Sequence, residues 1–300
     1  MKLRKLVLLA SFACVSILSI NSYNAKADTT SASQVKTTQQ TQLSNQESLT
    51  KQTENTKKII TTKNGSRYYL KNNKPVKGLK KIDNSWYLFN KNGKMLTNVH
   101  KIPHQNNYGN FAKDGKRKFS NTSTGKAYYW INKTGNITGI KNNAKVISQL
   151  PEMPTGCEIT AVTMMINFAG KNITKQQAAK IMPRSGNPNR GFVGNPYRKY
   201  PYGYWVAPNG VKPVVKHYLG TALNMTNCSL TAIKRKLIYS HLVVIWVGDF
   251  DGISNHAIAL TGYHNKTWYY NDPWTGTKRS MRESTLLNHW SKDKYRALSY

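Results

Sequence analysis

The sequence predicts an α+β domain in its C-terminal half, preceded by an array of β-hairpins and, before these, by a spacer without regular structure. Three observations lead to this prediction. In the C-terminal half, helical patterns come first and strand patterns follow, an order typical of α+β folds. The roughly 80 residues before it repeat an aromatic run and a turn. The spacer has almost no apolar residues from which to build a core.

The first 27 residues have the pattern of a secretory signal peptide. Lys2, Arg4 and Lys5 precede the apolar run LVLLASFACVSILSI, and the small residues of AKA then offer a cleavage site. The run has about 15 residues, fewer than the roughly 20 that span a bilayer, and no later segment approaches that length. We therefore expect a secreted chain without a transmembrane segment. The alternative is lipidation at Cys14, although Ser11 stands where a lipobox usually has Leu.

Residues 28–60 are predicted to be a hydrated, disordered spacer. They consist almost entirely of Thr, Ser, Gln, Asn and Lys, and they lack aromatic side chains. Such a segment cannot bury enough apolar area to offset the entropy lost on ordering.

The whole chain is strongly basic and therefore attracts polyanions. Its 45 basic and 12 acidic residues give a net charge of +33, and removal of the signal peptide, with four basic residues and no acidic one, leaves +29. The basic residues are scattered over the chain and do not form a recognisable nucleic-acid module, so no nucleic-acid partner is expected. For an exported bacterial protein, the expected partners are anionic cell-wall polymers or glycans.

Residues 61–141 contain four aromatic runs, each followed by a turn and a polar exit: YYLKNNKPVKG, WYLFNKNGKMLTN, YGNFAKDGKRK and YYWINKTGNITG. The turn positions Asn73, Gly93, Gly115 and Gly135 lie 20, 22 and 20 residues apart. This spacing predicts stacked β-hairpins in which each hairpin covers the aromatic face of its neighbour.

The array resembles the choline-binding and glucan-binding cell-wall repeats of Gram-positive surface proteins, most clearly in GLKKIDNSWYLFNKNGKMLTN. The resemblance implies that residues 61–141 bind wall polymers or glycans. Choline cages in that family use a Trp in each repeat, whereas only Trp86 and Trp130 occur here, so choline capture by cation–π contacts is not expected. Alternatively, these aromatic residues form only the hairpin core.

Residues 146–300 have the patterns of a compact domain. The segment CEITAVTMMINFAG predicts a helix that ends at Gly170, and Thr174 and Ser229 are expected N-caps of two further helices. Three strands are predicted to follow, at residues 242–248, 256–263 and 267–273.

Cys157 stands at the predicted start of the first of these helices. The positive end of the helix dipole and free backbone N–H groups would lower the pKa of its thiol and could hold an oxyanion beside the sulfur. The other interpretation is a buried structural cysteine, because lone cysteines are among the residues most often buried.

His256 and Asp272 favour the first interpretation. His256 lies in a strand with alternating apolar residues, sharing a face with Ile258 and Leu260, and Asp272 ends the next strand 16 residues later. A tight turn between the two strands can bring the carboxylate beside the imidazole, where it would fix the tautomer. Cysteine, histidine and aspartate are the components of a nucleophilic triad.

These segments, together with QLPEMPTGCEITAVTMMINFAG and GFVGNPY, resemble papain-like cysteine peptidases of the bacteriocin-processing type, peptidase family thirty-nine, and especially its exported branch. The resemblance covers about residues 146–295. It implies that Cys157 is the nucleophile, His256 the general base, Asp272 the orienting group and Gln149 an oxyanion-hole donor. Bacteriocin-processing domains are fused to membrane transporters, and no transporter is present here, so leader-peptide cleavage is not implied.

Other residues offer alternatives to these four or are expected to have structural positions. Asn271 could orient the imidazole in place of Asp272, and Cys228 is expected to be a small buried residue, unless it pairs with Cys157. His264 is expected to be exposed, and His217, His241 and His289 are expected at surface or packing positions. No His or Cys cluster has zinc spacing and no phosphate-binding glycine loop occurs, so neither a metal nor a cofactor is expected.

The leading functional hypothesis is a secreted, cell-wall-associated cysteine peptidase or amide hydrolase that acts through a thioester on a peptide or a peptidoglycan-type amide. A catalytically inactive surface adhesin or wall-binding protein is the first alternative, because a fold does not guarantee activity. The second is acyl transfer of the transpeptidase kind, in which an amine replaces water.

Overall fold

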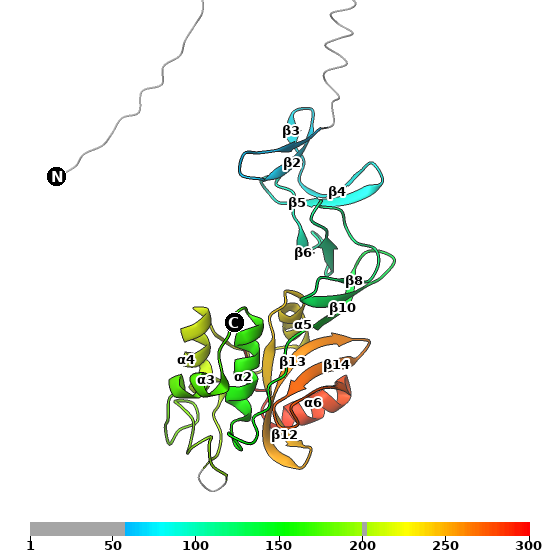
Figure 1. The fold of residues 1–300 in the computed structure, drawn as a ribbon. Coiled ribbons are helices and arrows are strands. Elements are labelled where there is room, and N and C mark those ends of the chain that lie inside the picture. The colour runs from blue at the N-terminus through cyan, green and yellow to red at the C-terminus, as the bar shows by residue number, and fades with distance from the viewer. Residues whose placement is uncertain (1–57, 200–202) are drawn as a thin grey trace, which may run out of the picture. The chain divides into compact units, whose positions relative to one another are not determined.

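The computed structural model describes residues 58–199 and 203–300, which comprise a series of small β-sheets followed by a larger mixed domain (Figure 1). The expected signal peptide at residues 1–27, and all but the last three residues of the expected spacer at residues 28–60, lie outside the described residues. No helix in the described part of the chain is long and apolar enough to span a membrane.

The first part consists of short antiparallel hairpins. One sheet contains three strands, and the next two sheets contain two each. These strands are β1 (Lys58–Thr61), β2 (Arg67–Lys71), β3 (Lys74–Pro75), β4 (Gly78–Ile82), β5 (Ser85–Phe89), β6 (Asn98–Lys101) and β7 (Tyr108–Phe111).

The turns between the hairpins have the left-handed backbone conformation that their residues favour. Asn73, Gly93, Gly115 and Gly135 have φ values of 58°, 78°, 89° and 77°. A Cβ at Gly93 would lie 2.4 Å from Cβ of Pro75, and one at Gly115 would lie 2.2 Å from Sδ of Met95. The turns at Gly93 and Gly115 therefore pack directly on the preceding hairpin, as the predicted stacking of the repeats requires.

A nine-stranded sheet forms the centre of the second part, in the order β11-β16-β12-β13-β10-β9-β8, with β14 paired to β13 and β15 paired to β14. Its strands are β8 (Thr122–Ser123), β9 (Ala127–Ile131), β10 (Ile137–Asn142), β11 (Leu223–Asn224), β12 (Val243–Phe250), β13 (Ile253–His264), β14 (Thr267–Asp272), β15 (Thr277–Arg282) and β16 (Ala297–Ser299). Strand β10 pairs with β9 on one side and with β13 on the other, so the last hairpin of the array continues into this sheet.

Helices cover both faces of the sheet. They are α2 (Cys157–Phe168), α3 (Lys175–Ile181), α4 (Pro208–Leu219), α5 (Leu230–Ile238) and α6 (Glu283–Lys292). One apolar core joins α2, α3 and α4 to β12 and β13 through Trp246, Ala257 and Ala259. A second core joins α5 and α6 to the opposite face through Ile258 and Trp268. The predicted α+β class is confirmed.

The capped helices begin where the sequence predicts. Thr174 and Gln177 form a capping box at α3, and Ser229 accepts a hydrogen bond from the Ala232 N–H at α5. Helices α4 and α6 were not predicted from the sequence. Helix α4 begins at Pro208, a residue favoured at a helix start, but Pro213 in its interior argues against a helix. Helix α6 begins after Arg282 without a side-chain cap.

Candidate active site

Cys157 is the first residue of α2 and lies in the core between this helix and the sheet. Gly156 allows the chain to approach closely before the helix, since a Cβ there would lie 2.7 Å from Cβ of Met153. Cys157 packs in the same core as Ala257, the residue that follows His256 on β13, and the backbone N–H of Ala257 acts to lower the pKa of the thiol. Cys157 therefore packs against the strand that carries the histidine. The residue is 8% exposed.

Glu158 is a part of this site that the sequence analysis missed. Its side chain is fully buried; one carboxylate oxygen accepts a hydrogen bond from the Val206 N–H at 3.1 Å, and the other lies 3.2 Å from Sγ of Cys157, which donates to it. Burial, opposed by these hydrogen bonds and reinforced by the charge of Asp293, raises the pKa of Glu158 to about 7.

The pKa of the Cys157 thiol is raised, which is the opposite of what its position at a helix start predicts. Burial is the main cause, and the charge and hydrogen bond of Glu158 act in the same direction; the Ala257 N–H opposes them only in part. The helix dipole is outweighed because desolvation penalises the thiolate strongly in a buried site.

His256 and Asp272 form a buried hydrogen-bonded pair. The Nε2 atom of His256 lies 2.9 Å from Oδ1 of Asp272, and each residue is 1% exposed. The same oxygen accepts a hydrogen bond from the Trp274 N–H, while Nη1 of Arg279 lies 3.2 Å from Oδ2. Burial alone would raise the pKa of Asp272, but the His256 hydrogen bond and charge, with these further donors, lower it to about 2. The carboxylate is thus held ionised beside the ring, which also stacks on Phe250 at 5.9 Å.

The four predicted site residues are brought together to different degrees. His256 and Asp272 are in contact, and Cys157 packs in the same core as Ala257, the residue after the histidine. Within the described residues, no hydrogen bond joins the thiol to the imidazole; the thiol donates to Glu158 instead.

Gln149 links the cysteine segment to the aspartate segment. Its Nε2 donates to the Pro154 carbonyl at 3.0 Å, three residues before Cys157, and its backbone N–H donates to the Pro273 carbonyl at 2.7 Å, one residue after Asp272. The Gln149 side chain is buried, and its Oε1 has no hydrogen-bond partner among the described residues.

The competing candidates take other positions. Asn271 donates to the carbonyl groups of Ala144 and Lys145, and within residues 58–199 and 203–300 no hydrogen bond joins it to His256. Cys157 and Cys228 are free thiols, and they pack in the cores on opposite faces of the sheet, so they cannot pair without unfolding.

The remaining histidines lie away from the Cys157 site. His264 is half-buried and stacks on Trp130 rather than being exposed. His241 stacks on Tyr300, and His289 bonds the Gly248 carbonyl. His217 is exposed on α4. No group of three or more metal-binding side chains gathers anywhere in residues 58–199 and 203–300.

Comparison with known proteins assigns the second part of the chain. The Peptidase_C39 like family profile matches residues 141–299. The chain belongs to this family. A cell wall binding repeat of the choline-binding type matches residues 77–95, within the hairpin array.

Individual relatives are more distant. YvpB, an uncharacterised protein of Bacillus subtilis, is 26% identical over 170 residues, 47% of this chain and 67% of its own. A C39-like peptidase from Bacillus anthracis is 26% identical, with a TM-score of 0.49, over 53% of this chain and 94% of its own. Choline binding protein F from Streptococcus pneumoniae is 19% identical over 27% of each chain, with a TM-score of 0.24.

The family membership and the repeats together place the chain in a family of cell-wall-associated peptidases. Both resemblances predicted from the sequence, to the C39 type of peptidase and to cell-wall repeats, are confirmed.

Proposed function

We propose that this chain is a secreted, cell-wall-associated cysteine peptidase or amide hydrolase, with Cys157 as nucleophile, His256 as general base, Asp272 as orienting group and Gln149 as oxyanion donor. The observation that carries the proposal is the buried His256–Asp272 pair, whose histidine directly precedes Ala257, a residue of the core that contains Cys157. A buried carboxylate with a low pKa serves to fix the tautomer of an imidazole.

In this proposal each ring nitrogen of His256 has its own role. Because Nε2 of His256 is engaged by Asp272, Nδ1 is the nitrogen that would take the proton from Cys157. The thiolate attacks the carbonyl carbon of the amide, and the oxyanion that forms is held by the Cys157 N–H and the Gln149 amide. His256 then gives its proton to the leaving amine as the C–N bond breaks, which leaves a thioester on Cys157. Water, deprotonated by His256, hydrolyses the thioester and restores the thiol.

The described structure is a resting state in this scheme. The thiol is almost fully buried and donates to Glu158, so it must turn from Glu158 toward His256 before it can react. Neutralisation of Glu158 would remove the negative charge that opposes thiolate formation.

Attachment to the wall is the second part of the proposal. A repeat of the cell-wall-binding type precedes the peptidase domain, and binding there would raise the effective concentration of the site near wall-linked amides. Secretion rests on the signal-peptide pattern of residues 1–27.

The test is hydrolysis of purified peptidoglycan and of a peptide library by the mature chain, its Cys157→Ala variant and, as a matched control, its Cys228→Ala variant. We expect Cys157→Ala to abolish product formation and Cys228→Ala to retain it. Equal hydrolysis by wild type and Cys157→Ala would overturn the proposal.

A second candidate function, wall binding without catalysis, is favoured by one observation. The raised pKa of Cys157 and its burial are the properties of a structural cysteine. This candidate predicts that the Cys157→Ala variant binds cell walls as tightly as wild type and that no substrate is cleaved by either protein.

A further inference from the structure

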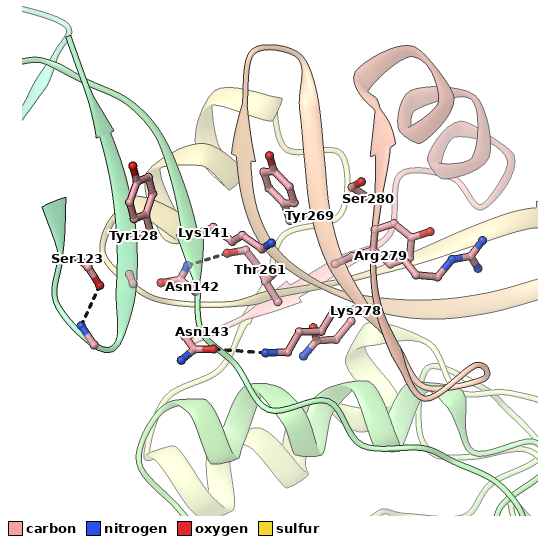
Figure 2. A pocket seen from close by; sticks show the side chains of 14 residues that line it. Ser123, Tyr128, Lys141, Asn142, Asn143, Thr261, Tyr269, Lys278, Arg279 and Ser280 are labelled. Atoms are coloured by element: carbon pink, nitrogen blue, oxygen red, sulfur yellow. Dashed lines mark hydrogen bonds between the residues drawn. The ribbon is translucent and has the colours of Figure 1, made fainter. Parts of the chain in front are cut away.

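A cavity of about 350 Å³ lies where the last hairpin meets the peptidase sheet. One wall comes from β8, β9 and β10 and the other from β13, β14 and β15; Figure 2 shows the side chains that enter it. None of Cys157, His256, Asp272 or Gln149 lines this cavity, although its lining residue Arg279 contacts Asp272.

The cavity exists because helices cover this face of the sheet only in part. Helix α2 packs over β12 and β13 at Val244, Ala257 and Ala259. Strands β9 and β15, which α2 does not cover, present Tyr128, which is 39% exposed, and Lys278, which is also exposed. Alternate residues of the same strands point to the opposite face and pack in the core with α5 and α6.

Aromatic rings form one part of the cavity and its border. Tyr128 and Trp130 on β9 meet edge to face at 5.0 Å, and Trp130 stacks on Tyr269 of β14 at 5.9 Å, with the planes 8° apart. His264 also stacks on Trp130, with the two ring centres 4.3 Å apart. Partly exposed aromatic rings beside amide and hydroxyl groups suit a ligand with apolar C–H faces and polar edges, such as a sugar ring.

Basic side chains line the other part of the cavity. The lining includes Lys141, Lys278 and Arg279 and no acidic residue. The Lys141 ammonium lies 4.8 Å from the Tyr269 ring centre, and the Lys278 ammonium donates to Asn143 at 3.3 Å. Figure 2 shows these two lysines extending from opposite walls into the space between β10 and β14–β15.

The two lysines differ from Arg279 in one respect that matters for binding. Arg279 is paired with Asp251 and Asp272, whereas neither Lys141 nor Lys278 forms an ion pair within residues 58–199 and 203–300. An incoming anion would therefore gain two charge-assisted contacts without displacing a carboxylate.

We propose that this cavity binds an anionic saccharide unit. The sugar ring lies against Tyr128 and Tyr269, and its phosphate or carboxylate group is held by Lys141 and Lys278. The volume is at the lower end of the range for ligand pockets and suits about one substituted sugar. The match of a cell wall binding repeat earlier in the chain favours a wall saccharide over a nucleic acid, which offers the same combination of charge and ring stacking. The site does not depend on catalysis at Cys157.

The test is isothermal titration of the mature chain with four probes: N-acetylglucosamine 1-phosphate, N-acetylmuramic acid, neutral N-acetylglucosamine and a single-stranded DNA oligomer. Binding of N-acetylglucosamine 1-phosphate would indicate a phosphate-bearing ligand, and binding of N-acetylmuramic acid would indicate a carboxylate-bearing one. Either result supports the proposal if the neutral sugar binds at least about tenfold more weakly. Preferred binding of the DNA oligomer, or equal binding of the neutral sugar, would overturn it.

Two double variants distinguish binding in the cavity from attraction by the net charge of the chain. Lys141→Gln with Lys278→Gln removes both cavity lysines, and Lys180→Gln with Lys216→Gln removes two exposed lysines of α3 and α4. We expect affinity for the anionic sugar to fall about tenfold or more in the first and to stay within about twofold of wild type in the second. An equal loss in both would show attraction by net charge alone. Lys278→Arg, which keeps the charge, is expected to retain binding and guards against a folding defect.

Discussion

Replacing Glu158 by Gln should remove a pH dependence of stability that comes from one buried carboxyl group. The pKa of Glu158 is raised from 4.5 to about 7, chiefly by burial. A raised folded-state pKa means that the native protein keeps a proton that the unfolded chain releases. The contribution of Glu158 to the free energy of unfolding is therefore present in full below about pH 4.5, and it is lost as the pH rises through about 7. At 1.36 kcal/mol for each pKa unit, the shift corresponds to about 3 kcal/mol.

Gln preserves the shape of the side chain and an oxygen that can accept from the Val206 N–H, but it does not titrate. The free energy of unfolding, measured by urea denaturation between pH 4.5 and 8, should fall with pH in the wild type and remain nearly level in Glu158→Gln. The matched control is Glu152→Gln. Glu152 is exposed, and its hydrogen bond to Lys175 lowers its pKa, so this variant should keep the wild-type fall.

The same substitution should also change the thiol. The charge of Glu158 raises the pKa of Cys157, so Glu158→Gln should move the alkylation profile of Cys157 to lower pH. Identical stability slopes and identical alkylation profiles in Glu158→Gln and wild type would refute the reasoning.

Three further predictions concern other parts of the chain. Asp272→Asn should show less loss of stability than wild type on acidification from about pH 4 to pH 2, because the lowered pKa of Asp272 favours the native state only above that window; acid unfolding followed by circular dichroism measures it. Gly115→Ala should be less stable than Gly125→Ala by about 1 kcal/mol or more in thermal unfolding. Both glycines have positive φ, but only at Gly115 does an added Cβ meet a neighbouring hairpin. Alkylation of the denatured mature chain without reductant should modify both Cys157 and Cys228, and a disulfide between them would contradict the described packing.

Local signals in the sequence were sufficient for several elements. Thr174 and Ser229 cap the helices that they predict, and the turn residues Gly93 and Gly115 adopt the expected left-handed conformation. These features depend on a few neighbouring residues, so a single sequence reveals them. Helix α4 was missed because its interior proline argues against a helix when packing is unknown.

The electrostatic features of the site could not be predicted in this way. Glu158 looks like an ordinary acidic residue in the first turn of a helix, which is normally exposed and favourable. It is buried, with the Val206 N–H donating to its carboxylate. Burial of the thiol itself is the main reason for the raised pKa of Cys157, and the charge of Glu158 adds to it. The cavity between the last hairpin and the peptidase sheet was also missed. Lys141 and Lys278 are brought near each other only because β10 pairs with β13 and β14 pairs with β15.

The central claim is that Cys157 is a nucleophile served by His256 and Asp272. Its most direct test is mass spectrometry of the mature chain after reaction with a peptidyl vinyl sulfone, which alkylates a thiolate positioned for attack. We predict one adduct, at Cys157, formed at least about a hundredfold more slowly in His256→Ala, because removal of the base leaves a thiol with a raised pKa. An adduct at Cys228 in preference to Cys157, or the same rate at Cys157 with and without His256, would contradict the claim.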